Sequence, residues 1–120
     1  MTGKLLIVED EETLRESLGR VLIQEGYEVD SVSSSEAALT TIDEKNYDLI
    51  ITDIILPGIN GIQLLRKCRE KNPKAKFIII TAFASIETAV EAIRTGAFDY
   101  LVKPIQHREL KDIIKKALLS

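Results

Sequence analysis

Residues that could carry out phosphoryl or metal chemistry follow four apolar runs in the sequence. Glu9-Asp10 follows the first of these runs, Asp53 the second, Thr81-Ala82 the third and Lys103 the fourth. Short apolar runs are typical of strands, and in an open α/β sheet binding sites form beyond the carboxyl ends of the strands. We therefore expect three carboxylates, a hydroxyl group and an ammonium group to meet at one edge of a sheet.

The three carboxylates of Glu9, Asp10 and Asp53 would repel one another at such an edge. Two like charges about 4 Å apart repel by about 4 kcal/mol at an effective dielectric constant of about 20, so we expect a cation between them. Charged oxygen ligands favour a hard divalent ion, and Mg²⁺ is therefore the predicted cofactor. With Mg²⁺ and the Lys103 ammonium neutralising the incoming oxygens, one carboxylate could attack a phosphoryl group and form an aspartyl phosphate.

Two neutral residues would complete this site. The Thr81 hydroxyl could donate a hydrogen bond to a phosphoryl oxygen, and the small side chain of Ala82 would leave the entrance narrow but open. The sequence contains no Walker A loop, dinucleotide-binding glycine motif, zinc-ligand set or Ser-His-Asp order that would indicate another chemistry.

Each candidate residue also has a structural interpretation. The acidic residues 10–12 could open a helix by capping its free N–H groups, and Asp53 could cap the turn after its strand. Thr81 and Lys103, taken singly, are usually structural or solvated, so the functional interpretation depends on their joint placement. Four other residues are predicted to be structural: His107 at the surface, Cys68 buried on a helix, and Phe83 and Tyr100 in packing.

The apolar runs have the pattern of a parallel sheet. Continuous runs, rather than alternating ones, suit strands that are covered on both faces, whereas residues 28–32 alternate and predict an edge strand. The stretches between the runs repeat their apolar residues with helical period, and each repeat forms a stripe that a sheet can cover. The continuous runs occupy residues 5–8, 49–51, 77–80 and 100–102, and the helical patterns occupy 14–22, 38–42, 62–68, 86–93 and 110–118.

Glycine, proline and polar residues mark the ends of these elements. Gly26 and Gly96 are expected to end helices, Asn72-Pro73 ends another, and Pro57-Gly58 indicates a turn after a buried strand. Two pairs have the spacing of a capping box, namely Ser33 with Glu36 and Asn60 with Gln63. The β-α alternation therefore runs about five times, which predicts an α/β fold with a doubly wound parallel sheet and helices on both faces.

Composition narrows the class of protein. The 120 residues are 45% hydrophobic and 29% charged with a formal charge of −3, which is typical of one globular domain and argues against non-specific nucleic-acid binding. The single cysteine excludes an internal disulfide framework and suggests a reducing compartment. The sequence shows neither a secretory signal nor an apolar run of the roughly 20 residues that a membrane span needs. We expect a cytoplasmic protein that binds neither membranes nor nucleic acid directly.

From Lys4 to Leu119 the sequence resembles the receiver domain of bacterial two-component response regulators. The motifs that carry the resemblance are Leu-Ile-Val-Glu-Asp at 6–10, the stretch 48–58 around Asp53, Thr81-Ala82 and Lys103-Pro104. The resemblance implies a single receiver domain over residues 1–120. It also implies the flavodoxin-like receiver fold, a five-stranded parallel sheet with the strand order 2-1-3-4-5.

The resemblance also implies roles for the acidic residues. Asp53 would accept a phosphoryl group from a sensor histidine kinase, so the protein would be a switch rather than an enzyme. Asp10 would bind Mg²⁺ directly, Glu9 would bind it through water, and the backbone carbonyl of Ile55 would be a further ligand. Many receivers have an aspartate where Glu9 stands in this sequence, and this common variant leaves the metal role in place.

A second group of residues would transmit the signal in such a receiver. Lys103 would pair with Asp53 and then with its phosphate, and the Lys103–Pro104 peptide bond would be cis. Thr81 and Tyr100 would form a switch pair in which the threonine moves onto the phosphoryl group and the aromatic ring turns inward. This would change the face formed by the fourth helix, the fifth strand and the fifth helix, about residues 85–118, where a homodimer could also form.

Residues 81–100 show a narrower resemblance, to the receivers of NtrC-type transcription activators. In those proteins an ATPase domain and a helix-turn-helix DNA-binding domain follow the receiver. The sequence could accordingly be an excised domain that controls transcription, or a stand-alone receiver that acts through protein contacts.

Two functions of other classes are alternatives to a receiver. A Mg²⁺-dependent phosphohydrolase with an aspartyl intermediate usually has a second aspartate two residues after the nucleophile, where this sequence has Ile55. A flavodoxin-like cofactor binder should have a phosphate-binding loop after the first strand. Here residues 9–12 are all acidic and would repel a phosphate.

Overall fold

Strands and helices alternate along the whole chain, as the apolar pattern predicts. A computed structural model describes residues 2–120. The strands are β1 (Lys4–Val8), β2 (Glu28–Val32), β3 (Leu49–Thr52), β4 (Lys76–Thr81) and β5 (Asp99–Val102). The helices are α1 (Glu12–Gln24), α2 (Ser35–Glu44), α3 (Gly61–Lys71), α4 (Ile86–Thr95) and α5 (His107–Leu119).

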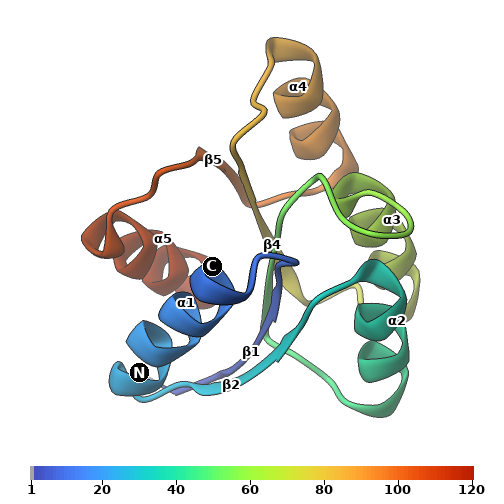
Figure 1. Cartoon of the computed structure of the whole chain (residues 1–120). Helices are drawn as coiled ribbons and strands as arrows, with labels where there is room; N and C mark the ends of the chain where they lie inside the picture. The colour runs from blue at the N-terminus through green and yellow to red at the C-terminus, as the bar shows by residue number, and fades with distance from the viewer. Residues whose placement is uncertain (1) are drawn as a thin grey trace.

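The five strands form one parallel sheet in the order β2-β1-β3-β4-β5. This is the predicted doubly wound order, and β2, whose residues alternate, lies at an edge as expected. Figure 1 shows α1 and α5 on one side of the sheet and α2, α3 and α4 on the other. The predicted α/β class, with helices on both faces of the sheet, is therefore confirmed.

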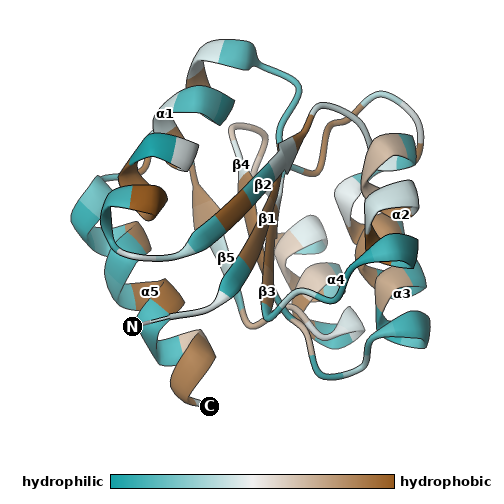
Figure 2. Ribbon diagram, turned by 90° about the horizontal axis from the view of Figure 1, so that it is seen from below, coloured by the Kyte–Doolittle hydropathy of each residue, from teal (hydrophilic) through white to brown (hydrophobic). Residues whose placement is uncertain are grey.

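Two apolar cores, one on each face of the sheet, hold these layers together. Leu5, Ile7 and Leu49 point toward α1 and α5, while Leu6 and Ile50 point toward α2 and α3. Figure 2 shows that apolar colour gathers on the central strands, with hydrophilic colour on the outer sides of the helices. Because successive residues of a strand point to opposite faces, a continuous apolar run supplies both cores at once.

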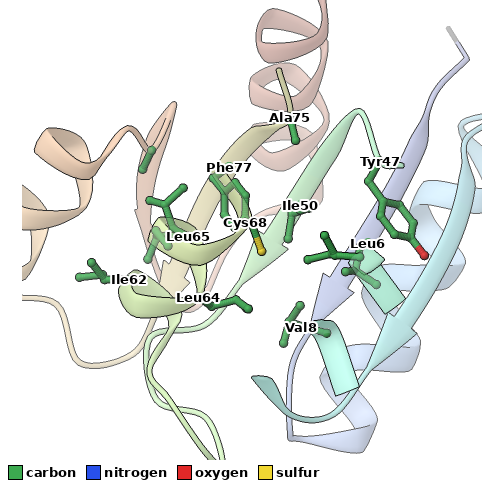
Figure 3. Close-up of a cluster of buried hydrophobic side chains, with 14 of the residues drawn as sticks. Leu6, Val8, Tyr47, Ile50, Ile62, Leu64, Leu65, Cys68, Ala75 and Phe77 are labelled. Atoms are coloured by element: carbon green, nitrogen blue, oxygen red, sulfur yellow. The ribbon is translucent and has the colours of Figure 1, made fainter. Parts of the chain in front are cut away.

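The core on the α2–α3 face contains the single cysteine of the chain. Cys68 is fully buried between α3 and the sheet, near Phe77 and Ile50 (Figure 3). Burial in this apolar core raises the pKa of the Cys68 thiol to about 12, so the thiol stays protonated at neutral pH. The prediction that Cys68 is a small buried hydrophobic residue is confirmed.

Most of the predicted helix ends agree with the structure. α3 ends at Lys71 with Asn72 as its C-cap, and Asn60 and Gln63 form the expected capping box at its start. α4 ends at Thr95 with Gly96 as its C-cap, and Gly96 has a φ of +116°. A side chain at Gly96 would be strained in this left-handed conformation and would meet the Arg69 guanidinium at 2.8 Å.

The capping box predicted for Ser33 and Glu36 is wrong. The N-cap of α2 is Ser34, whose hydroxyl accepts a hydrogen bond from the Ala37 N–H at 3.1 Å. Beginning the helix one residue later buries Ser35, and its hydroxyl donates to the Pro57 carbonyl at 2.9 Å. A contact between distant segments thus selects which serine caps the helix.

Two predictions about burial on the α4 side are also wrong. Phe83, expected in packing, is 70% exposed, because the loop before α4 carries it away from both cores. The apolar stripe of α4 was expected to be covered by the sheet, but Ile86 is 85% exposed and Ile93 50% exposed. Ala92 is the one buried residue of α4, so this helix packs on the sheet through a small part of its surface.

Two remaining features agree with the sequence. His107 is exposed at the first position of α5, as predicted for a surface residue. Among residues 2–120, no helix combines the length and the apolar character that crossing a membrane requires.

Candidate functional site

Lys103 joins two buried carboxylates at the carboxyl edge of the sheet. Its Nζ donates to Oδ2 of Asp53 at 2.6 Å and to Oε1 of Glu9 at 2.7 Å. Asp53 is 7% exposed and Glu9 4% exposed, so these charges are largely removed from water. Two carboxylates share one ammonium, which leaves one negative charge in excess at the centre of the site.

The register of the parallel strands brings these residues together. Val8 at the end of β1 lies opposite Thr52 at the end of β3, and the Asp53 N–H donates to the Val8 carbonyl at 3.2 Å. The next residue along β1 is Glu9, which therefore lies beside Asp53. On the other side of the site the Lys103 N–H donates to the Thr81 carbonyl at 2.9 Å, so Lys103 continues the pairing of β5 with β4.

The two carboxylate oxygens of Asp53 have different partners. Oδ2 accepts from Lys103, while Oδ1 accepts from the Ile55 N–H at 3.3 Å. The structural interpretation of Asp53 as the cap of the following turn is thus correct for one oxygen. The ion pair with Lys103 shows that turn capping does not account for the other oxygen.

Every polar atom of Glu9 also has a partner. Its N–H donates to the Val32 carbonyl at 3.1 Å, and its Oε2 accepts from the Glu11 N–H at 3.0 Å. Its carbonyl oxygen accepts from Nη1 of Arg15 at 2.9 Å. The acidic run does open α1, with Glu11 as the N-cap and Glu12 in the first turn, but Glu11 forms no side-chain cap bond, so its predicted capping of a free N–H is wrong.

Lys103 remains charged in this setting. Burial lowers the pKa of its ammonium, but the hydrogen bonds and charges of Asp53 and Glu9 raise that pKa by more, so that it lies above the usual value for lysine. The ammonium is therefore a permanent positive charge at neutral pH.

The Lys103–Pro104 peptide bond is cis, as the resemblance to receiver domains implies.

The other predicted site residues lie around this ion pair. Asp10 is exposed beside Glu9, Ala82 is exposed, and the Ile55 backbone reaches Asp53 through its N–H. Thr81 is fully buried, and its Oγ1 accepts a hydrogen bond from the Phe83 N–H at 3.1 Å. Within residues 2–120, no three His, Cys, Asp or Glu side chains are already gathered into a metal-binding group.

Two residues near the site were not singled out from the sequence. Arg15 contacts the backbone of Glu9, as described above. Thr88, in the first turn of α4, lies 2.6 Å from the hydroxyl of Tyr100 and also forms a capping box with Ser85. The Ser85–Thr88 spacing is a cap signal that the sequence could have provided, whereas the contact of Thr88 with Tyr100 depends on the fold. Tyr100 packs against the core, as predicted.

Comparison with known proteins agrees with this geometry. The model of the response regulator receiver domain family matches residues 5–115. The chain is 41% identical over 120 residues to the response regulator protein FleR of Pseudomonas aeruginosa. The matched region covers 100% of this chain and only 25% of FleR.

Two solved structures extend the likeness. NtrX from Brucella abortus in complex with ADP has a TM-score of 0.92 and 32% identity, covering 99% of this chain and 27% of that one. The beryllofluoride-activated NtrC4 receiver domain dimer has a TM-score of 0.92 and 33% identity, covering 97% of this chain and 96% of that one. The chain therefore belongs to the receiver domains of two-component response regulators, close to those of NtrC-type transcription activators, and the general function of this family is a phosphorylation-dependent switch.

Proposed function

We propose that Asp53 is the phosphoryl acceptor of this receiver. The observation that carries the proposal is the contact of its buried Oδ2 with the Lys103 ammonium at 2.6 Å. An ammonium at this position can neutralise charge that arrives on phosphoryl oxygens. Asp53 also follows a buried strand at the edge where sites of α/β sheets form.

The transfer would take place at one oxygen of Asp53. A carboxylate oxygen forms a bond to phosphorus, while the phosphorus–nitrogen bond of a phosphohistidine on a sensor kinase breaks. The electron pair of the broken bond stays with the imidazole nitrogen, which recovers its proton from water. Lys103 would then exchange its carboxylate partner for a phosphoryl oxygen and would remain paired throughout.

The charge balance of the site favours Mg²⁺. The Lys103 ammonium leaves one negative charge in excess between Glu9 and Asp53, and Asp10, whose side chain is exposed, is the next residue after Glu9. We assign Asp10, Asp53 and the Ile55 carbonyl as direct ligands and Glu9 as a ligand through water. When bound, Mg²⁺ would neutralise the oxygens of the phosphoryl group.

Thr81 is suited to report a phosphoryl group to the rest of the domain. Within residues 2–120 its buried hydroxyl accepts one hydrogen bond, from Phe83, and donates none. That proton is free to bond a phosphoryl oxygen on Asp53, which would shift the loop between β4 and α4. Tyr100, bonded to Thr88 of α4, is the residue through which we expect the shift to reach the α4–β5–α5 face.

The exposed side of α4 is the proposed output face. Ile86, Val90 and Ile93 of α4 and Val102 of β5 are 43–85% exposed, and apolar side chains gathered in this way mark interaction surfaces. The NtrC4 receiver is a dimer when activated by beryllofluoride. We propose that a second copy of this chain covers the α4 stripe when Asp53 is modified.

We also propose that the output is transcription activation through C-terminal ATPase and DNA-binding domains, since the chain spans about a quarter of FleR and of NtrX.

Sedimentation velocity tests the output face. Beryllofluoride with Mg²⁺ should convert the chain to a dimer, and Ile86→Ser should keep it monomeric. Ile23→Ser is a matched control, because Ile23 is 58% exposed on α1, away from that face. A species that stays monomeric with beryllofluoride would contradict a dimer-based output.

A beryllofluoride titration followed by NMR tests the site itself. Beryllofluoride mimics a phosphoryl group on a carboxylate, and we expect the amides of Asp53, Thr81, Phe83 and Lys103 to shift together and only when Mg²⁺ is present. Asp53→Asn should abolish the shifts. Shifts that do not depend on Mg²⁺, or that persist in Asp53→Asn, would contradict the proposed acceptor.

A further inference from the structure

Arg15 turns back from α1 toward the acidic edge of the sheet. It stands in the first turn of α1, yet its side chain is half-buried rather than extended into solvent. Its Nη1 donates to the Glu9 carbonyl at 2.9 Å and lies 3.5 Å from the Asp10 carbonyl. The guanidinium thus binds the backbone of the two residues that follow β1, not their carboxylates.

This contact completes the restraint of Glu9. Its N–H is held by β2 and its two carboxylate oxygens by Lys103 and the Glu11 N–H, which leaves the carbonyl as the one polar atom for Arg15 to hold. A free carbonyl at this position would allow the Glu9–Asp10 peptide plane to rotate. The position of Asp10 relative to Glu9 would then no longer be fixed.

The chemistry of the contact favours arginine at this position. A guanidinium has several donors in one plane, and the N–H groups of Nη1 alone can reach the two successive carbonyls of Glu9 and Asp10. Groups behind a metal ligand that fix its orientation change metal affinity by about tenfold or more when they are removed.

We infer that Arg15 is a positioning residue, which fixes the Glu9–Asp10 peptide and so helps these two residues to hold a divalent cation together with Asp53. The inference rests on the proposed function, because it assigns Glu9 and Asp10 to that cation. The positioning role of Arg15 and its positive charge predict opposite effects of Arg15→Met on the affinity for Mg²⁺. Loss of a nearby positive charge alone would strengthen Mg²⁺ binding, whereas loss of positioning would weaken it.

An NMR titration with MgCl₂ separates the two effects. We expect Arg15→Met to weaken Mg²⁺ binding by about tenfold, and Arg15→Lys to recover part of the loss because lysine can still donate to one carbonyl. Arg20→Met is the matched control, since Arg20 is exposed on the same helix and lines, with Arg15, a groove between α1 and β2. Its loss removes the same charge. In the metal-free protein, the Glu11 amide should shift in Arg15→Met but not in Arg20→Met.

The outcomes distinguish the inference from the function on which it rests. If the wild-type chain binds no Mg²⁺, the proposed metal site fails. If the wild-type chain binds Mg²⁺ but Arg15→Met binds it equally or more tightly, or matches Arg20→Met, the role of Arg15 is overturned and the metal site stands. A thermal melt of each variant identifies any that fails to fold, and Arg15→Gln then replaces it in the same titration.

Discussion

Lys103 Nζ lies 2.6 Å from Oδ2 of Asp53, although the two residues are 50 positions apart in the sequence. The contact joins the ends of β3 and β5, two strands that are not neighbours in the sheet. Glu9, the residue after β1, binds the same ammonium at 2.7 Å. The three strand ends are therefore held together by charge as well as by the backbone ladder.

Lys103→Met should destabilise the domain and change its response to pH. Removing one partner of a buried ion pair costs about 3–5 kcal/mol, and the 19% exposure of the Lys103 side chain favours the lower end of this range. Glu9 and Asp53 would then face each other without the cation that both of them bind. Urea denaturation at several pH values measures the difference.

The wild-type chain should lose the stability that Lys103 contributes when the solution becomes alkaline. Because folding raises the pKa of Lys103, the stability that this residue contributes is complete below the pKa of lysine in the unfolded chain. It is lost as the pH rises through the higher pKa of the folded state. A wild-type chain that shows the same stability as Lys103→Met at neutral pH would contradict the ion pair.

Gly61 and Gly19 should respond in opposite directions to alanine. A Cβ at Gly61, the first residue of α3, would lie 2.1 Å from the Asp53 carbonyl oxygen, so α3 would have to move away from the site. Gly19 is inside α1 with no atom within 4 Å of an added Cβ, and alanine there should stabilise the helix by about 0.5–1 kcal/mol. Thermal melts should place Gly61→Ala below and Gly19→Ala above the wild type. Equal melting temperatures for the two variants would contradict this close approach.

Tyr47→Phe should raise the pKa of the Asp30 carboxyl. The Tyr47 hydroxyl donates a hydrogen bond to Oδ2 of Asp30 at 2.6 Å. This hydrogen bond is the main cause of the lowered pKa of Asp30, and Lys45 lowers that pKa by a smaller amount. Because folding lowers the pKa, the stabilising effect is present above the pKa of the unfolded chain and is lost as the pH falls through the folded value. We expect the free energy of unfolding to fall by about 1 kcal/mol at neutral pH, since the Asp30 side chain is 38% exposed and partly screened by water, and to fall by less in acid. An NMR titration of Asp30 measures the pKa, with Lys45→Met as the control of smaller effect, and an unchanged pKa in Tyr47→Phe would refute the assignment.

Thr88 and Tyr100 should be energetically coupled across α4 and β5. Their hydroxyl oxygens are 2.6 Å apart, and contacting pairs show interaction energies of about 0.5–3 kcal/mol in double-mutant cycles. The cycle uses Thr88→Val, Tyr100→Phe and the double variant in urea denaturation. Thr88→Ser keeps the hydroxyl and should retain the coupling. Additivity within about 0.3 kcal/mol would show that the two hydroxyls do not stabilise each other.

The site was accessible to sequence reasoning because parallel strands carry their ends to one edge. Once residues 5–8, 49–51 and 100–102 are assigned as strands, Glu9, Asp53 and Lys103 must meet, and the structure places them within hydrogen-bonding distance. The edge position of β2 also follows from its alternation. These conclusions need only the period of the apolar residues and the direction of the strands.

Contacts between distant segments were beyond this kind of reasoning. Ser34, not Ser33, caps α2 because Ser35 reaches Pro57, and no local pattern records that contact. Periodicity identified the apolar stripe of α4 but could not tell that the sheet leaves it exposed. The same limit applies to Arg15, since the direction in which a long side chain turns depends on which carbonyls lie beside it.

The identity of the phosphoryl acceptor is tested most directly by intact-protein mass spectrometry after incubation with acetyl phosphate and Mg²⁺. We predict one phosphoryl group on the wild-type chain, none without Mg²⁺ and none on Asp53→Asn. Asp43→Asn, which alters an exposed aspartate on α2, should be modified like the wild type. A phosphoryl adduct that persists in Asp53→Asn, or a wild-type chain that gains none, would contradict the assignment of Asp53.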